Sequence, residues 1–152
     1  MTLRIVPLGG LGEIGMNCLA IEQPDGILVV DAGITFPHQD LGVDVYHPDF
    51  SWLDQHADRV VGVFLTHGHE DHVGALPYLL EHLDVPVFGP PHALAMAKRR
   101  LVEHDFASHD LDLHEVRAGS LTRVGPFEVE AIRVSHSIVE ASALCIETAE
   151  GF

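Results

Sequence analysis

A continuous apolar run that leads directly into a histidine-rich hexapeptide is the feature that most limits how this chain can fold. The run is Val60-Val61-Gly62-Val63-Phe64-Leu65, and the hexapeptide is His67-Gly68-His69-Glu70-Asp71-His72. An unbroken apolar run is typical of a strand buried on both faces, as in a parallel sheet covered on both sides. The sequence therefore predicts a layered α/β architecture with a polar site just beyond this strand.

The spacing within the hexapeptide indicates metal binding. Side chains two residues apart point the same way in an extended loop, so His67 and His69 can reach one ion together. Asp71 and His72 fall where the chain turns into a helix, and they can face a neighbouring ion. Imidazole and carboxylate ligands without a thiolate suit Zn²⁺ or Mn²⁺. We predict a dinuclear metal site; the alternative is a solvated histidine-rich loop in which Asp71 caps a helix.

One loop supplies too few ligands for a catalytic metal, and His136 is the natural further candidate. It follows a strand predicted over 127–134 and precedes Ser137, so only the fold can bring it to His67. The alternative is a lone histidine at a strand end. The other histidines share no ligand spacing and are expected at or near the surface; they are His38, His47, His56, His82, His92, His104, His109 and His114.

Apolar patterning and turn residues predict the remaining elements. Strands are expected over 3–8, 17–22, 27–31, 86–89, 127–134 and 142–148, the second and third forming a hairpin around Pro24-Asp25-Gly26. Helices are expected over 48–55, over 91–103, and from an Asp71 cap to about His82, with Pro77 tolerated or kinking the last of these. Ala149-Glu150-Gly151 is typical of a hairpin turn whose second strand has barely begun at Phe152. We therefore expect residues 1–152 to be part of a longer chain.

A glycine-rich segment near the start could be mistaken for a nucleotide site. Gly10-Leu11-Gly12-Glu13-Ile14-Gly15 matches the G-x-G-x-x-G dinucleotide fingerprint, and Asp31 follows at the distance of a ribose-binding acid. That fingerprint needs a helix that begins at the glycines and a long crossover to a parallel strand. Here only strand-like residues separate the glycines from a Pro-Asp-Gly turn. We exclude a nicotinamide or flavin site and expect a loop that passes close to something bound nearby.

Charge and composition exclude further classes. Eight Lys+Arg against 23 Asp+Glu give a formal net charge of −15, which argues against a sequence-independent binder of phosphate backbones. The basic cluster Lys98-Arg99-Arg100 is expected on a solvated helix face or end, with a phosphate contact as the second interpretation. No apolar run reaches the ~18 residues of a membrane span, and the start lacks the regions of a signal peptide. Cys18 and Cys145 lie in apolar runs as small core residues, so we expect a cytoplasmic protein.

Several blocks together resemble the N-terminal part of ribonuclease J, a family in the β-CASP branch of metallo-β-lactamase-fold nucleases. The blocks are Leu8-Gly9-Gly10, Glu13-Ile14-Gly15-Met16-Asn17, Asp31-Ala32-Gly33, Phe36-Pro37, Gly42-Val43-Asp44 and the stretch THGHEDHVGALPYLL that begins at Thr66. The resemblance covers essentially the whole chain. It implies a metallo-β-lactamase-type αββα sandwich, of which residues 1–152 are the N-terminal portion of one domain, and a cytoplasmic enzyme of RNA processing and decay, ribosomal RNA included.

The resemblance also implies a ligand set. One zinc ion would be bound by His67, His69 and His136, and a second by Asp71 and His72. A bridging aspartate, a further histidine and the β-CASP insertion would lie beyond residue 152. Without them, residues 1–152 are expected to bind metal poorly and to lack nuclease activity.

Two details of the resemblance concern single loops. The family usually has a proline three residues after its third histidine, where this chain has Val139, so the histidine is kept while the loop sequence departs. In some relatives the Gly-Val-Asp loop holds an accessory calcium ion, which Asp44 would bind here; an exposed loop aspartate is the simpler interpretation.

The expected reaction is hydrolysis of RNA phosphodiesters, by exo- or endonucleolytic cleavage. Two ions would lower the pKa of a bridging water, so that a metal-bound hydroxide attacks the phosphate. Asp71 would hold this hydroxide in line. Asp31 would accept a hydrogen bond and orient ligand histidines, or else be a turn aspartate before Gly33.

The partners implied are RNA and further copies of the chain, with no membrane. Two other functions stay open: hydrolysis of thioesters or lactones in the same fold, and a non-catalytic RNA-processing scaffold. Such scaffolds typically lose ligands, whereas five candidates remain in this chain.

Overall fold

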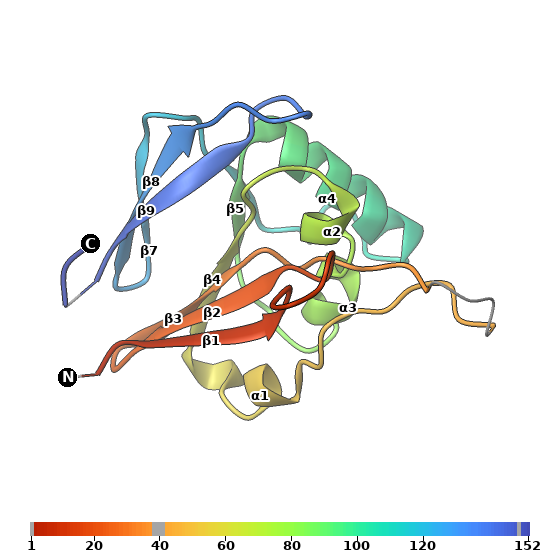
Figure 1. The fold of residues 1–152 in the computed structure, drawn as a ribbon, viewed down its shortest axis with the longest axis horizontal. Coiled ribbons are helices and arrows are strands. Elements are labelled where there is room, and N and C mark those ends of the chain that lie inside the picture. The colour runs from red at the N-terminus through yellow and green to blue at the C-terminus, as the bar shows by residue number, and fades with distance from the viewer. Residues whose placement is uncertain (1, 38–41, 149) are drawn as a thin grey trace.

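Two β-sheets and a layer of helices make up the computed structural model, which describes residues 2–37, 42–148 and 150–152. Figure 1 shows the three-stranded sheet on one side of the six-stranded sheet and most of the helices on the other. The strands are β1 (Arg4–Gly9), β2 (Cys18–Gln23), β3 (Gly26–Val30), β4 (Val60–Phe64), β5 (Val87–Gly89), β6 (Leu113–Glu115), β7 (Leu121–Val124), β8 (Phe127–Arg133) and β9 (Ser142–Glu147). The helices are α1 (Ser51–Asp54), the 3₁₀ turn η1 (Ala57–Arg59), α2 (Glu70–Val73), α3 (Leu76–Leu80) and α4 (Pro91–Glu103). The predicted layered α/β architecture is confirmed.

The six-stranded sheet, in the order β1-β2-β3-β4-β5-β6, changes from antiparallel to parallel at β3. The predicted hairpin of β2 and β3 is confirmed, with Leu19 opposite Val30 and a turn at Pro24 and Asp25. Strand β4 lies in the middle, parallel to β3 and to β5, as its apolar run predicted. Because the carboxyl ends of parallel strands meet at one edge, the segments that follow β3, β4 and β5 lie close together.

Apolar side chains fill the spaces on both faces of this sheet. Between sheet and helices, the core includes Leu65 and Leu79, both fully buried. Between the two sheets, Phe64 of β4 packs in one cluster with Phe127 of β8. Burying such a side chain contributes about 2–3 kcal/mol. Along β8 the side chains alternate, with Phe127, Val129 and Ala131 buried, so this strand presents one face to the first sheet.

The predicted long helix with an Asp71 cap is wrong. Helix α2 has His69 at its N-cap position, so Asp71 lies in the first turn, and a second helix, α3, begins at Leu76. The break has two causes. The N–H of Ala75 donates to the carbonyl of Ala32, in the segment after β3, and Pro77 has no N–H to continue the ladder.

Other boundaries differ in smaller ways. The helix predicted from residue 48 begins at Ser51, whose backbone N–H is bound by the Asp49 carboxylate. Strands β6 and β7 were not predicted, because each is three or four residues long and largely exposed. The predicted turn at 149–151 includes Ala149, which lies outside the described residues; Thr148 and Gly151 beside it form an antiparallel bridge.

Candidate metal centre

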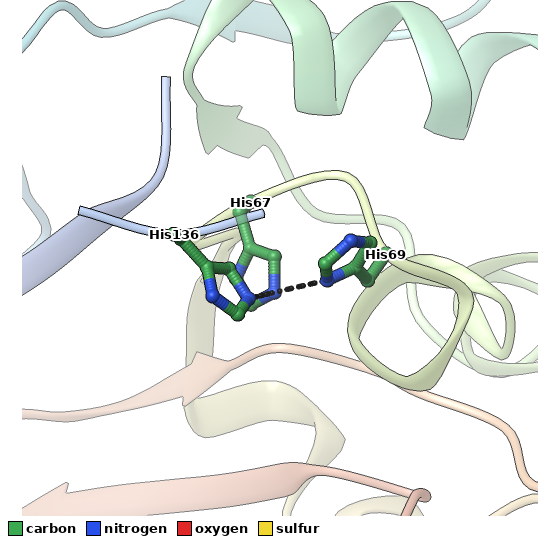
Figure 2. Close-up of side chains that lie close together, drawn as sticks. All are labelled: His67, His69 and His136. Carbon is green, nitrogen blue, oxygen red and sulfur yellow. Dashed lines mark hydrogen bonds between the residues drawn. The ribbon is translucent and has the colours of Figure 1, made fainter. Parts of the chain in front are cut away.

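Three histidines from two sheets meet at the edge of the sandwich. His67 and His69 lie in the loop that follows β4, and His136 follows β8. Nε2 of His67 is 3.1 Å from Nδ1 of His69 and 3.2 Å from Nε2 of His136. Figure 2 shows the three rings turned toward one another. The structure therefore brings His136 to the loop that the sequence analysis singled out.

A backbone hydrogen bond fixes the approach of the two sheets at this point. Ser142, the first residue of β9, donates its N–H to the carbonyl of Thr66, at 3.1 Å. The partner strand β8 ends opposite it, with Arg133 beside Ser142. The segment between β8 and β9, which carries His136, is thereby held against the histidine loop.

The donor set fits a divalent cation. Four ligand bonds of ~2.0–2.1 Å in a tetrahedron place neighbouring ligand atoms ~3.3–3.4 Å apart. The distances from His67 to its two neighbours are close to that value. Burial, together with repulsion from the charge that His72 carries when it is protonated, lowers the pKa of His67 to about 4, so its ring is neutral at pH 7. Neutral imidazole is the form that binds metal.

Asp31 supports the histidine cluster through hydrogen bonds to Thr66 and His72. It follows β3, is buried, and has a left-handed φ of 60° that costs roughly 1 kcal/mol. Its carboxylate accepts hydrogen bonds from the backbone N–H of Thr66 at 2.7 Å and from the Thr66 hydroxyl at 2.8 Å. It also pairs with Nδ1 of His72, at 2.8 Å. The alternative of a simple turn aspartate does not account for these contacts.

The hydrogen bonds of Thr66 are consistent with one tautomer for each of two rings. Because its hydroxyl proton points to Asp31, the oxygen accepts from Nδ1–H of His67, 2.9 Å away. His72 directs its own Nδ1–H at the Asp31 carboxylate. Both rings then present the Nε2 lone pair, the ligand atom, on the opposite side.

Asp71 and His72 form a second polar group on α2, beside the first. The His67 and His72 ring centroids are 3.9 Å apart, and Asp71 Oδ2 lies 3.6 Å from Nε2 of His72. Burial opposes protonation of His72, but the hydrogen bond to Asp31 and the charges of Asp31 and Asp71 outweigh it and raise its pKa.

Asn17 is a site residue to which sequence reasoning gave no role. Its side-chain Nδ2 lies 3.0 Å from the Asp71 carbonyl, 3.2 Å from Asp71 Oδ2 and 3.2 Å from Nε2 of His72. Its backbone N–H also donates to the Asp71 carbonyl. Asn17 lies far from α2 in sequence, and no spacing pattern connects the two. Thr66 was likewise recognised only as part of a longer matching block.

Short backbone contacts hold α2 against the sheet. Ala32 donates its N–H to the carbonyl of His72, at 2.8 Å. Gly33 packs so closely that a Cβ there would lie 1.7 Å from the Asp71 carbonyl oxygen. On the other side, Arg100 of α4 forms an ion pair with Glu70, at 2.8 Å. The basic cluster was predicted on a solvated helix face, and its Arg100 also holds α2 in place through this ion pair.

The remaining predicted residues lie apart from the histidines. Asp44 is exposed in its loop, and within 2–37, 42–148 and 150–152 the one group of three or more metal-ligating side chains found is His67, His69 and His136. The glycine-rich segment 10–15 forms a loop with positive φ at Gly10, Gly12 and Gly15, and no helix begins there. This agrees with the exclusion of a dinucleotide site. His38, whose placement the sequence left at the surface, lies outside the described residues.

Comparison with known proteins agrees with this geometry. The model of the Metallo-beta-lactamase superfamily matches residues 11–140, which include all of the candidate ligands. The chain belongs to the metallo-β-lactamase superfamily. The fold class predicted from the sequence is confirmed, with helix, sheet and sheet forming three layers of the αββα sandwich.

Among curated proteins, the chain is similar to several named ribonuclease J. It is 43% identical to Ribonuclease J of Helicobacter pylori, over 99% of this chain and 22% of the relative. It is 40% identical to Ribonuclease J2 of Bacillus subtilis, over 98% and 27%, and 38% identical to Ribonuclease J 1 of Streptococcus pyogenes, over 97% and 26%. The chain thus spans about a quarter of the length of these relatives.

Solved structures share the fold at lower identity. The Rm3 metallo-beta-lactamase superposes with a TM-score of 0.63 at 21% identity, over 97% of this chain and 57% of the other. A protein of unknown function from Enterococcus faecalis superposes with a TM-score of 0.67 at 19% identity, over 97% and 41%. These likenesses concern the fold alone.

Proposed function

We propose that this chain carries the metal-holding part of a ribonuclease that hydrolyses RNA phosphodiesters. The observation that carries the proposal is the convergence of three imidazoles from two sheets, His67, His69 and His136, in a superfamily of metal-dependent hydrolases. Identities of 36–43% to proteins named ribonuclease J support RNA as the substrate. The natural partners would then be RNA and, in a homo-oligomer, further copies of the chain.

The residues have separate roles in this proposal. His67, His69 and His136 would hold one Zn²⁺ ion, and Asp71 and His72 a second, with Mn²⁺ as the alternative metal. Divalent cations supply a lowered water pKa and neutralise charge on phosphate oxygens.

The protein supplies orientation around that chemistry. Asp31 is hydrogen-bonded to His72 directly and to His67 through the Thr66 hydroxyl. These hydrogen bonds keep Nε2 of both rings directed away from Asp31 and available to a cation. The Asp71 side chain is 40% exposed, so its carboxylate can accept a hydrogen bond from an attacking water.

The complete enzyme is proposed to be larger than residues 1–152. Ribonuclease J relatives match this chain over only 22–27% of their length. We place a bridging carboxylate, a further histidine and a β-CASP insertion in the additional sequence, and the enzyme in cytoplasmic RNA processing. No helix among the described residues is both long enough and apolar enough to cross a membrane.

The test uses the protein at its natural full length. Zinc and manganese content is measured by mass spectrometry, and turnover is measured on a labelled single-stranded RNA, a thioester and a lactone. We expect bound divalent metal and cleavage of RNA only. Turnover of the thioester or lactone without RNA cleavage would replace the ribonuclease by another hydrolase, and metal binding without any turnover would favour a scaffold.

A further inference from the structure

A second concave site lies beside the histidine cluster, on the other side of the segment that carries His136. It is a cavity of about 350 Å³, where the start of α4 and the end of β6 meet the ends of β8 and β9. Its lining includes two arginines, Arg117 and Arg133, together with Pro90, Glu140 and Ala141. A volume of this size lies at the lower end of the ~300–1,000 Å³ typical of small-ligand sites.

The register of β8 directs Arg133 toward this space. Side chains two apart in a strand share a face, and Phe127, Val129 and Ala131 are buried on the face of β8 that meets the first sheet. Arg133, the last residue of β8, lies on the same face as these three residues, at the edge of the core between the two sheets. Arg117 reaches the same rim from the other sheet, directly after the buried Val116.

Among the described residues, neither arginine has a carboxylate partner, which is unusual in so acidic a chain. In the part of the chain that the structure describes, four other arginines form ion pairs with glutamates: Arg4, Arg59, Arg99 and Arg100. Within the same described residues, the side chains of Arg117 and Arg133 form no hydrogen bond or ion pair. Glu140 shares the cavity, but its Oε2 accepts the backbone N–H of His92 in the first turn of α4, at 2.9 Å. The guanidinium groups are therefore available to an anion.

Arg133 lines both this cavity and a hollow beside the histidine cluster. Arg133 and Glu140 also line a second, open hollow of about 620 Å³, whose wall includes His136 and Val139. Arg133 therefore borders an open hollow that leads to His136, where an anion could contact both. Guanidinium is the side chain best suited to bind a phosphate with two parallel hydrogen bonds.

We propose that Arg117 and Arg133 form a phosphate-binding subsite that holds the RNA next to the metal centre. The proposal rests on the proposed function for its substrate. Two sources could supply the phosphate: an internal phosphodiester upstream or downstream of the cleaved bond, or a 5′-terminal phosphomonoester. Both present the same oxygens to the two guanidinium groups.

The experiment measures RNA binding and turnover separately, in the full-length protein. Arg117→Ala, Arg133→Ala and the double variant are compared with Lys98→Ala, which removes one positive charge from the exposed face of α4. The dissociation constant of a short 3′-labelled RNA is measured in EDTA over a range of KCl concentrations. EDTA prevents cleavage and removes the contribution of the metal. KM and kcat are then measured with metal present, and thermal unfolding confirms that each variant folds.

Each arginine substitution should weaken RNA binding about tenfold, as loss of a charge-assisted contact does. The slope of log Kd against log salt should fall by ~0.7 for each arginine removed. KM should rise while kcat changes little, Arg133→Lys should keep the salt slope, and Lys98→Ala should resemble the wild type. Wild-type affinity and salt slope in both arginine variants would overturn the subsite, whether or not the protein cleaves RNA.

Matched RNAs with a 5′-monophosphate or a 5′-hydroxyl identify the source of the phosphate. If the arginine effect is present only with the 5′-monophosphate, the subsite holds the terminal group; an equal effect with both identifies an internal phosphodiester. RNA binding that depends on both arginines in a protein without nuclease activity would keep the subsite and reject the proposed reaction. Failure of the wild type to bind RNA at all would reject both.

Discussion

The two halves of the candidate metal centre are held in place in different ways. The three histidines come from both sheets, and His136 lies 3.2 Å from His67 near the point where Ser142 of β9 donates its backbone N–H to the carbonyl of Thr66. Asp71 and His72 instead lie on one short helix, which the first sheet holds through hydrogen bonds to its backbone and side chains. The first group depends on the packing of two sheets, the second on hydrogen bonds to the segments that precede β2 and follow β3.

This difference indicates which group is ready to accept a cation. His67 is neutral, and its Nε2 faces two further ring nitrogens. His72 has a raised pKa, and its Nε2 lies beside the amide of Asn17. We expect the three-histidine group to bind metal first and more tightly, and the Asp71–His72 group to need a further anionic ligand.

The largest expected effect comes from the three-histidine group. His69→Ala in the full-length protein removes one of three converging ligands, so metal content should fall and RNA hydrolysis should drop by at least ~100-fold. Elemental analysis and turnover on labelled RNA measure both. His109→Ala is the control, because its side chain is 82% exposed and far from the cluster in sequence. Full activity in His69→Ala would remove the catalytic role of this group.

Asp31→Asn tests whether both groups share one support. Asparagine tolerates the left-handed backbone at this position, so the fold should be kept while the charge behind His72 is lost. We expect metal affinity and kcat to fall ~10–100-fold, the usual range for partners that orient metal ligands. Isothermal titration with Zn²⁺ measures the affinity. Asp25→Asn, in the exposed hairpin turn, is the control, and an equal result for the two variants would contradict the role of Asp31.

Alanine substitutions at Gly33 and Gly68 test how tightly the backbone is packed around each of the two groups. Gly33→Ala would place Cβ 1.7 Å from the Asp71 carbonyl oxygen, so α2 must shift. We expect the free energy of unfolding to fall by about 3 kcal/mol, the upper part of the range for overpacking. Gly68→Ala, in the loop of the three histidines, meets side-chain atoms of His92 and Met96 at 3.2 Å and the Ala93 Cα at 3.4 Å, and should cost about 1 kcal/mol. Urea unfolding measures both, and an equal cost would show that α2 is not held more tightly than the loop.

The smallest expected effect is that of Asn17→Ala. This change removes the side-chain contacts to Asp71 and His72 but leaves the backbone hydrogen bond to the Asp71 carbonyl. Loss of one such contact predicts a roughly 2–10-fold decrease in affinity for the second metal equivalent. Stepwise Zn²⁺ titration separates it from the first equivalent. Glu13→Ala, in the neighbouring glycine loop, is the control; a larger loss in the first equivalent would reverse the assignment of Asn17 to the Asp71–His72 group.

The sequence by itself determined the layered architecture and the place of the site along the chain. The apolar run 60–65 predicted β4 as a central buried strand, because only a strand covered on both faces is apolar at every position. The spacing of His67, His69, Asp71 and His72 also predicted which residues lie at its end. These are local properties, since strand period and loop direction act over a few residues.

Only the tertiary structure decided how the ligands are oriented and where the helix after them ends. The contacts of Asn17 with Asp71, of Asp31 with Thr66, and of Ser142 with the histidine loop join segments tens of residues apart, and no sequence period records them. The break after α2 has in part the same origin, because the N–H of Ala75 is bound by the carbonyl of Ala32 in the segment after β3. The physical reason is that these contacts form only when the two sheets and the helix layer pack together, whereas sequence patterns report preferences that act over a few residues.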